Sequence, residues 1–386
     1  MSTQRSEAVD DILIVDDTPA NLRLLSQMLA EHGHSVRAVT SGGRALASAQ
    51  LSRPDLILLD IKMPEMDGYE VCERLKADGQ TRDVPVIFIS ALDELQDKVR
   101  AFAVGGVDYI TKPFQVEEVL ARVETHLALR RLQEQLENAN KKMARELALA
   151  GQVQASFLPS KLPHIPGWQL TVDLKPVTQT SGDFYDVMPL QNGKLGILIA
   201  DVVDKGVGAA LYMALSWTLI RTYAAEYPTQ PELVLSAVNR RILMDTSAEQ
   251  FVSVFYGIID PSTGAMTYCN AGHYPPYLLR AHNGGAVESL TGTGMVLGVE
   301  KDVKWQQASA QLAPGDVLVL YTDGITDAED ERGAFFGQER LLETVQASLG
   351  SSAQDIQDSL LTAVHNFVGN SVQFDDMALM VVMRDV

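Results

Sequence analysis

The chain has 386 residues, 46% of them hydrophobic and 21% charged, which is enough for two packed cores joined by a connector. Its net charge of −19 argues against nucleic acid as a partner, because phosphate binding needs clustered Lys and Arg. Two isolated cysteines, the lack of an 18-residue apolar run and a polar start predict no disulfide framework, no membrane association and a cytoplasmic location.

The first third of the chain alternates short apolar runs with amphipathic segments. The predicted strands are Ile12–Val15, Val36–Val39, Leu56–Leu59, Val86–Ile89 and Tyr109–Ile110. Continuous apolar strands separated by helical segments are typical of a parallel sheet that is covered on both faces. We therefore predict a doubly wound α/β domain with five parallel strands over residues 1–125.

Polar residues follow the ends of these predicted strands. They are Asp16, Asp17, Asp60, Ser90 and Lys112. Ligands of doubly wound sheets gather beyond the carboxyl ends of the strands, so these side chains are expected on one rim. Two acids suit Mg²⁺, a third can accept a phosphoryl group, and a hydroxyl and an ammonium can bind its oxygens. The alternative, ordinary strand-end polar residues, requires five coincidences.

Three segments, Val15–Asp17, Asp60–Gly68 and Asp108–Phe114, resemble the signature of two-component receiver domains, which have a flavodoxin-like fold. The resemblance implies that a sensor histidine kinase or another phosphodonor phosphorylates Asp60. It also implies further roles: Asp16, Asp17, Asp60 and the backbone carbonyl of Lys62 would bind Mg²⁺, Ser90 and Lys112 would hold phosphoryl oxygens, and Tyr109 would reorient when Ser90 moves.

Residues 116–157 contain no proline and one glycine. Apolar residues recur every three or four positions, namely Leu129, Leu132, Leu136, Ala139, Met143, Leu147, Ala150, Val153 and Phe157. This spacing predicts a coiled-coil linker over residues 126–158 and a parallel homodimer through it. The alternative is a spacer helix that packs on its own domain. Glu146 interrupts the seam, which makes this helix a candidate two-state element.

The remaining sequence predicts a mostly antiparallel domain over residues 159–386. Predicted strands are Leu170–Val172, Leu195–Ala200, Val252–Ile259, Ala265–Cys269, Tyr277–Arg280, Val317–Tyr321 and Met377–Met383. Predicted helices are Gly208–Glu226, Pro231–Thr246, Gln338–Leu349 and Ala353–Val368. A Ser-Thr-Gly turn at 262–264 indicates a hairpin, and an α/β/β/α sandwich accommodates this order.

Acidic residues lie at or just beyond the ends of apolar runs in this half as well. They are Asp183, Asp201, Asp323, Asp375 and Asp376. Strands that converge would gather these carboxylates in one place. Unpaired buried carboxylates are costly and hard divalent cations prefer oxygen ligands, so the pattern predicts a metal site.

Five motifs, at 181–186, 200–211, 270–276, 321–327 and 375–379, are together similar to the SpoIIE/RsbU branch of the PPM (PP2C-like) serine/threonine phosphatases. The resemblance implies that Asp201 bridges two Mn²⁺ or Mg²⁺ ions and that the backbone carbonyl of Val202 is a ligand. Asp183, Asp323 and Asp375 would complete the ligand set.

Other residues near these motifs are expected to have secondary roles. Asp186, Asp204, Asp327 and Asp376 are expected around the site or at the surface, and not as ligands. His273 is expected to be structural. Lys205 is a candidate for binding the substrate phosphate. Val203 stands where eukaryotic relatives have a histidine.

Receiver, helix and phosphatase in this order resemble the RssB/RsbU class of response regulators, especially the phosphatase-bearing RssB type of pseudomonads. The resemblance implies that the substrate is a phosphorylated anti-sigma factor antagonist of the STAS type, in control of sigma factors by partner switching. The alternative is a non-catalytic adaptor that delivers a sigma factor to a protease. The presence of all four proposed metal ligands favours catalysis, because a binding domain has no need of carboxylates that converge on a metal ion. These ligands are Asp183, Asp201, Asp323 and Asp375.

Overall fold

The structure is a computed structural model that describes residues 9–91, 95–246, 250–371 and 373–386. The chain divides into two compact units, Met1–Lys142 and Met143–Val386, each with its own hydrophobic core. The boundary between the units falls within one long helix, α5 (Val116–Ala155). Among the described residues, no helix combines the length and the apolar character that crossing a membrane requires.

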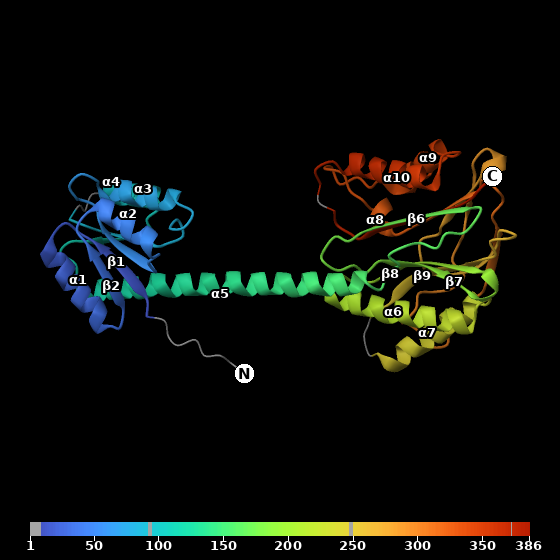
Figure 1. Ribbon diagram of the computed structural model, residues 1–386, viewed down its shortest axis with the longest axis horizontal. Coiled ribbons are helices and arrows are strands. Elements are labelled where there is room, and N and C mark those ends of the chain that lie inside the picture. Colours follow the sequence, from blue (N-terminus) through green and yellow to red (C-terminus); the bar gives the residue numbers. More distant parts are fainter. Residues whose placement is uncertain (1–8, 92–94, 247–249, 372) are drawn as a thin grey trace. The chain divides into compact units, whose positions relative to one another are not determined.

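The first unit contains a parallel five-stranded sheet in the order β2-β1-β3-β4-β5 (Figure 1). Its strands are β1 (Asp11–Val15), β2 (Ser35–Val39), β3 (Leu56–Asp60), β4 (Val86–Ser90) and β5 (Asp108–Thr111). Its helices are α1 (Pro19–Glu31), α2 (Gly42–Leu51), α3 (Gly68–Ala77), α4 (Leu95–Ala103) and the start of α5. The predicted doubly wound fold is confirmed, and all five predicted strands are present.

Successive residues of each strand point to opposite faces of this sheet. Ile12 and Ile14 of β1 pack with residues of α1 and α5, whereas Leu13 and Val15 pack with residues of α2, α3 and α4. Both faces are therefore covered, which is why β1, β3 and β4 are largely unbroken apolar runs.

The second unit contains two antiparallel five-stranded sheets, in the orders β13-β10-β9-β8-β7 and β12-β11-β14-β15-β6. The strands are β6 (Trp168–Lys175), β7 (Phe184–Pro189), β8 (Leu195–Val202), β9 (Val252–Ile259), β10 (Ala265–Ala271), β11 (Tyr277–Arg280), β12 (Ala286–Ser289), β13 (Ala308–Gln311), β14 (Val317–Tyr321) and β15 (Met377–Arg384). The helices after α5 are α6 (Val207–Glu226), α7 (Pro231–Asp245), α8 (Asp323–Thr326), α9 (Gly337–Ala347) and α10 (Ala353–Val368), with short 3-10 turns at Gln191–Gly193 and Ala281–Asn283.

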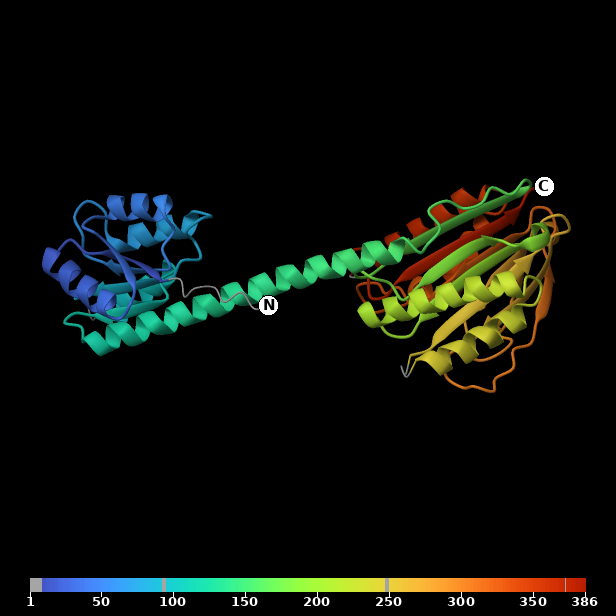
Figure 2. The same cartoon turned by 60° about the horizontal axis from the view of Figure 1, so that its bottom comes forward.

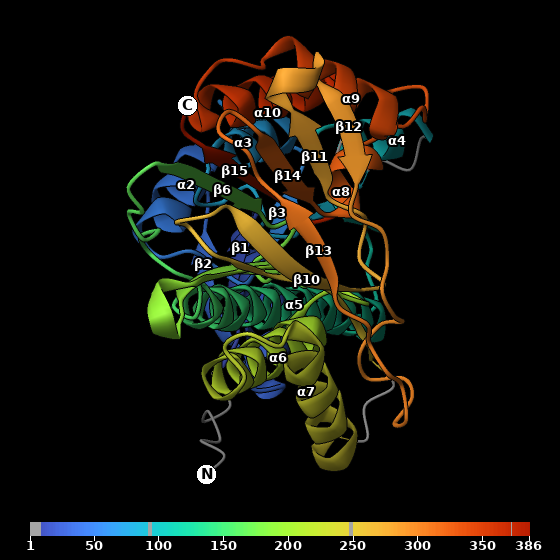
Figure 3. The same cartoon turned by 90° about the vertical axis from the view of Figure 1, so that its right-hand side faces the viewer.

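These elements form four layers, which Figures 2 and 3 show from two sides: α6 and α7 cover one sheet, α9 and α10 cover the other, and the sheets face each other. Ile197 and Ile199 of β8 pack between the sheets against Leu320 of β14 and Met380 of β15. The predicted α/β/β/α sandwich is confirmed, including the β9–β10 hairpin. The prediction missed β7, β12, β13 and the four-residue helix α8.

Candidate functional site

In the first unit, the carboxylates of Asp16, Asp17 and Asp60 meet at the ends of β1 and β3. One ligand oxygen from each lies within 4.8 Å of the others, which suits a single divalent cation. Lys112 Nζ lies 2.8 Å from Asp16 Oδ2 and 3.0 Å from Asp60 Oδ2. The side-chain amide of Asn21 donates to both carboxylate oxygens of Asp16, a contact that the sequence did not reveal.

Burial and ion pairing shift the pKa values of Asp60 and Lys112. Burial raises the pKa of Asp60 even though the hydrogen bond from Lys112 opposes the shift. Burial also works against the charge of Lys112, but its hydrogen bonds to Asp16 and Asp60 prevail and its pKa is raised. Asp60 and Lys112 therefore form a charged pair that a bound cation or a phosphoryl group would reorganise.

The remaining residues predicted for the receiver site lie on β4, on β5 and in the loop after β3. Ser90 ends β4 and is fully buried, and Tyr109 of β5 is almost fully buried with the Lys98 ammonium 5.7 Å from its ring centre. Lys62 is exposed in the loop after β3. The structure thus brings Asp16, Asp17, Asp60 and Lys112 together.

In the second unit, the acidic motifs lie at the ends of β8 and β14 and at the starts of β7 and β15. Asp183, which is 2% exposed, interacts electrostatically with Asp201, and Thr322 Oγ1 donates to Asp183 Oδ2 at 2.6 Å. Asp323 interacts electrostatically with Asp201 and with Asp375. All four predicted aspartates therefore contribute to one acidic centre.

The charges of this centre repel one another. Burial and the neighbouring charge of Asp201 raise the pKa of Asp183 well above its usual range. Burial and Asp323 raise the pKa of Asp201 to about 7. In the described part of the chain, the four aspartates do not form a group as compact as that of the receiver.

The donor set fits divalent cations of the Mn²⁺ or Mg²⁺ type, because it consists of carboxylates and open backbone carbonyls. The main observation that supports a metal site is the close approach of Gly182 to two backbone carbonyls. A Cβ atom at Gly182 would lie 2.9 Å from the carbonyl oxygen of Val202 and 3.4 Å from that of Asp204. A side chain at this position would cover both oxygens, so glycine keeps the carbonyl of Val202 open to a ligand.

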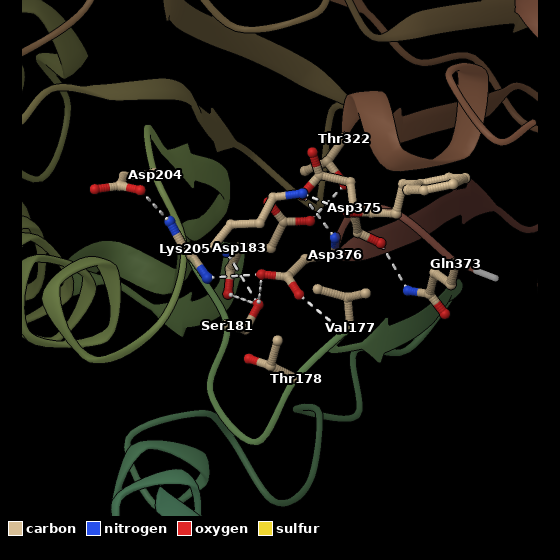
Figure 4. Close-up of polar contacts among 12 residues, drawn as sticks. Val177, Thr178, Ser181, Asp183, Asp204, Lys205, Thr322, Gln373, Asp375 and Asp376 are labelled. Atoms are coloured by element: carbon tan, nitrogen blue, oxygen red, sulfur yellow. Dashed lines mark hydrogen bonds and ion pairs between the residues drawn. The ribbon is translucent and has the colours of Figure 1, made fainter.

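Lys205 lies over the acidic centre (Figure 4). Its ammonium is 3.0 Å from Asp375 Oδ1 and also donates to the carbonyl of Phe374. Both partners of this ion pair are about half exposed. A cation bound at Asp375 would have to displace this ammonium.

Asp376, expected around the site or at the surface, is buried and organises the loop of residues 176–183 between β6 and β7. Its carboxylate accepts from the Val177 amide at 2.7 Å, from Ser181 Oγ at 2.9 Å and from the Gly182 amide at 2.8 Å (Figure 4). These three bonds fix the loop next to Asp183.

The other acidic neighbours lie in different surroundings. Asp186 is fully buried in β7 and forms a bidentate ion pair with Arg221 of α6. The guanidinium of Arg221 also stacks on the Trp217 ring. Asp204 and Asp327 are exposed. Sequence spacing alone could not reveal the ion pair of Asp186, because Arg221 is 35 positions away in the chain.

His273 contacts both sheets of the second unit. It is buried between the two sheets, with Nδ1 2.8 Å from Ser253 Oγ and Nε2 3.2 Å from the carbonyl oxygen of Tyr321. Burial lowers its pKa to about 4, so the ring is neutral near pH 7. Ser253 pairs with Asp201 across β8 and β9, and Tyr321 lies two residues before Asp323. His273 therefore links β9, the neighbour of the strand that carries Asp201, to the end of β14, two residues before Asp323.

Comparisons with known proteins agree with this division. The family model of Stage II sporulation protein E (SpoIIE) matches residues 191–385, more than half of the chain, and the response regulator receiver domain model matches residues 12–124. Protein IcfG of Synechocystis sp. is 34% identical over 268 residues, covering 62% of this chain and 42% of IcfG. Phosphoserine phosphatase RsbU of Bacillus subtilis is 29% identical over 267 residues, covering 68% of this chain and 75% of RsbU.

The fold of the second unit also matches a solved structure. The SiaA-PP2C domain of Pseudomonas aeruginosa superimposes with a TM-score of 0.57 and 22% identity, over 64% of this chain and 99% of that domain. The chain spans less than half the length of IcfG, so the similarity concerns shared domains and not the whole of that protein.

Proposed function

Because the chain belongs to the SpoIIE family of PP2C-type phosphatase domains and also carries a receiver domain, we propose that it is a response regulator whose output is metal-dependent protein phosphatase activity. The reaction is hydrolysis of a phosphoserine or phosphothreonine on a protein. The observation that carries the proposal is the convergence of Asp183, Asp201, Asp323 and Asp375 on one centre beside the open carbonyl of Val202.

Each residue of this centre has a proposed role. Asp201 would bridge two Mn²⁺ or Mg²⁺ ions, with the Val202 carbonyl, Asp183, Asp323 and Asp375 as further ligands. Two such ions, when bound, lower the pKa of a water molecule and stabilise an in-line displacement at phosphorus. Thr322 orients Asp183 through its hydroxyl. The ammonium of Lys205, once displaced from Asp375, is placed to bind a phosphoryl oxygen of the substrate.

The receiver supplies the proposed input. A sensor histidine kinase or a small phosphodonor would transfer a phosphoryl group to Asp60, with Mg²⁺ held by Asp16, Asp17, Asp60 and the carbonyl of Lys62. The compact carboxylate group and the pairing of Lys112 with Asp60 support this assignment. Ser90 and Lys112 would hold the phosphoryl oxygens, and Tyr109 would follow the movement of Ser90.

The proposed substrate is a phosphorylated anti-sigma factor antagonist of the STAS type, and the proposed outcome is control of sigma-factor activity by partner switching. The similarity to RsbU, which is named a phosphoserine phosphatase, supports a phosphoserine substrate. The competing function is a non-catalytic adaptor of the RssB type. Burial of Asp183 beside Asp201 favours catalysis, because an adaptor gains nothing from a centre that is costly to keep charged.

We also propose a homodimer through α5. Large apolar side chains at Leu129, Leu132, Leu136 and Met143 are exposed on this helix. Their spacing of three, four and seven residues follows one helix face, and a second copy of α5 would cover it. Phosphorylation at Asp60 would then change phosphatase activity through the dimer.

The test is Mn²⁺- or Mg²⁺-dependent hydrolysis of a phosphoserine protein and of a chromogenic phosphate ester. The parent chain and Asp323→Asn are compared at equal concentration. We expect the variant to lose at least about a hundredfold in rate, because a metal ligand is removed. Equal rates in both proteins, or no rate in either with both metals, would indicate the adaptor.

A further inference from the structure

The last turns of α5 contact the loop of residues 176–183, which leads directly into Asp183. Gln154 of α5, only 7% exposed, makes two hydrogen bonds to the backbone of Ser181. Its amide nitrogen donates to the Ser181 carbonyl, and its amide oxygen accepts from the Ser181 amide at 2.9 Å. A single buried side chain thus satisfies both backbone groups of one loop residue.

A second contact holds the same two segments together. Gly151, one turn before Gln154, lies so close to the loop that a Cβ atom there would be 1.9 Å from the carbonyl oxygen of Gln179. Only glycine permits this approach without movement of the backbone. Phe157 then packs edge-on against Trp217 of α6, with 5.6 Å between ring centres, and anchors the chain just after the helix.

The opposite side of the loop is held by Asp376, through the amides of Val177 and Gly182 and the hydroxyl of Ser181. Ser181 is therefore held between Gln154 and Asp376. Two residues further on, Asp183 accepts from Thr322 and lies beside Asp201. A shift of the last turns of α5 would pull on this loop from one side only, while Asp376 stays with β15.

We propose that Gln154 is a positioning residue that sets the metal affinity of the acidic centre, by holding the 176–183 loop in the conformation that presents Asp183. This inference rests on the proposed function, which assigns the metal ligands. It adds the contact through which α5 acts on those ligands. Withdrawal of the Gln154 side chain frees the backbone of Ser181, and Asp183 loses its fixed position. Partners that orient metal ligands contribute about 10–100-fold to metal affinity.

Three variants of the full chain test the proposal. Gln154→Ala removes both hydrogen bonds. Gly151→Ala pushes against the carbonyl of Gln179 and raises the intrinsic helix propensity, so its effect cannot come from a weakened helix. Gln152→Ala is the matched control, because Gln152 is an exposed glutamine of the same helix turn.

The first measurement is hydrogen exchange of peptides covering residues 177–183, in EDTA. We expect faster exchange at the Ser181 amide in Gln154→Ala and in Gly151→Ala, and parental exchange in Gln152→Ala. The second is Mn²⁺ binding by titration calorimetry, with an expected weakening of about tenfold in the two test variants. The third is the rate at saturating Mn²⁺, which is expected to return to within about threefold of the parent, since no reacting group is removed.

The outcomes separate this inference from the proposed function. Exchange and Mn²⁺ binding need no turnover, so a parent that binds Mn²⁺ but hydrolyses no phosphate ester contradicts only the proposed function. Parental exchange and parental Mn²⁺ affinity in Gln154→Ala would overturn the inference, as would a parent that binds no metal. If Gln154→Ala does not fold, Gly151→Ala decides the matter by the same criteria.

Discussion

The ammonium of Lys205 lies 3.0 Å from a carboxylate oxygen of Asp375. The residue proposed to bind the substrate phosphate is therefore paired with a proposed metal ligand. The pair is about half exposed, and exposed pairs contribute at most about 1 kcal/mol. In Lys205→Met we expect Mn²⁺ to bind up to about fivefold more tightly, because no ammonium competes for Asp375. The KM for the phosphorylated substrate should rise.

Titration calorimetry and steady-state kinetics measure the two effects separately. Lys301→Met, which removes an exposed lysine outside the acidic centre, is the control and should change neither. Weaker Mn²⁺ binding in Lys205→Met would show that the lysine supports the metal site instead of competing with the ion.

Asp201 and Asp376 should respond oppositely to the same chemical change. In EDTA, Asp201→Asn is expected to increase the free energy of unfolding, because it removes one of several repelling, partly buried carboxylates. Asp376→Asn should decrease it by about 3 kcal/mol, because an amide cannot accept the same set of hydrogen bonds from Val177, Ser181 and Gly182.

Urea unfolding followed by tryptophan fluorescence measures this contrast, since all three tryptophans (Trp168, Trp217 and Trp305) lie in the second unit. Asp201→Asn should also lose Mn²⁺-dependent activity. A destabilised Asp201→Asn protein in EDTA would contradict the assignment of a strained acidic centre.

The pKa of Asp201 predicts how the stability of the second unit depends on pH. Its folded pKa of about 7 exceeds the ordinary value of 3.8, so the folded state binds a proton more tightly than the unfolded state. The contribution is fully present below about pH 4 and is lost as the pH rises to about 7. The parent in EDTA should therefore lose stability relative to Asp201→Asn over this range.

Saturating Mn²⁺ should reverse that loss, since a cation replaces the proton as the counter-charge. The measurement is the difference in unfolding free energy between parent and variant at pH 4, 5.5 and 7. A difference that does not change with pH would mean that the carboxyl of Asp201 titrates normally.

His273 predicts a dependence of the opposite sign. Its folded pKa of about 4 lies below the ordinary 6.5, so the unfolded state takes up a proton first and stability falls as the pH drops from about 6.5 to 4. His273→Gln should abolish this slope and lower stability at pH 7, because the bonds to Ser253 and Tyr321 are disturbed. Equal acid sensitivity in parent and variant would place the titration elsewhere.

The sequence predicted most of the fold, and the failures have physical causes. Receiver strands β1, β3 and β4 are buried on both faces, so each is an apolar run that ends at or next to a site residue. Strands β12 and β13 were missed because each is four residues long, largely exposed and at the edge of its sheet, which leaves little apolar pattern. Strand β7 was missed because its first three residues belong to the motif at 181–186.

The site was predictable only where a motif marks it. The ligand candidates stand in recognisable motifs, whereas Gln154 contacts a residue 27 positions away and Asp376 contacts residues almost 200 positions away. Such pairs arise from the packing of β15 and α5 beside one loop. These contacts cannot be read from the local sequence.

Neighbouring positions 375 and 376 carry the same amino acid for unlike purposes. The first is half exposed and paired with a lysine, and the second is buried and accepts three hydrogen bonds from the loop of residues 176–183. A substitution at position 375 is therefore expected to abolish phosphatase activity with little change in the free energy of unfolding. A substitution at position 376 is expected to reduce the population of folded protein.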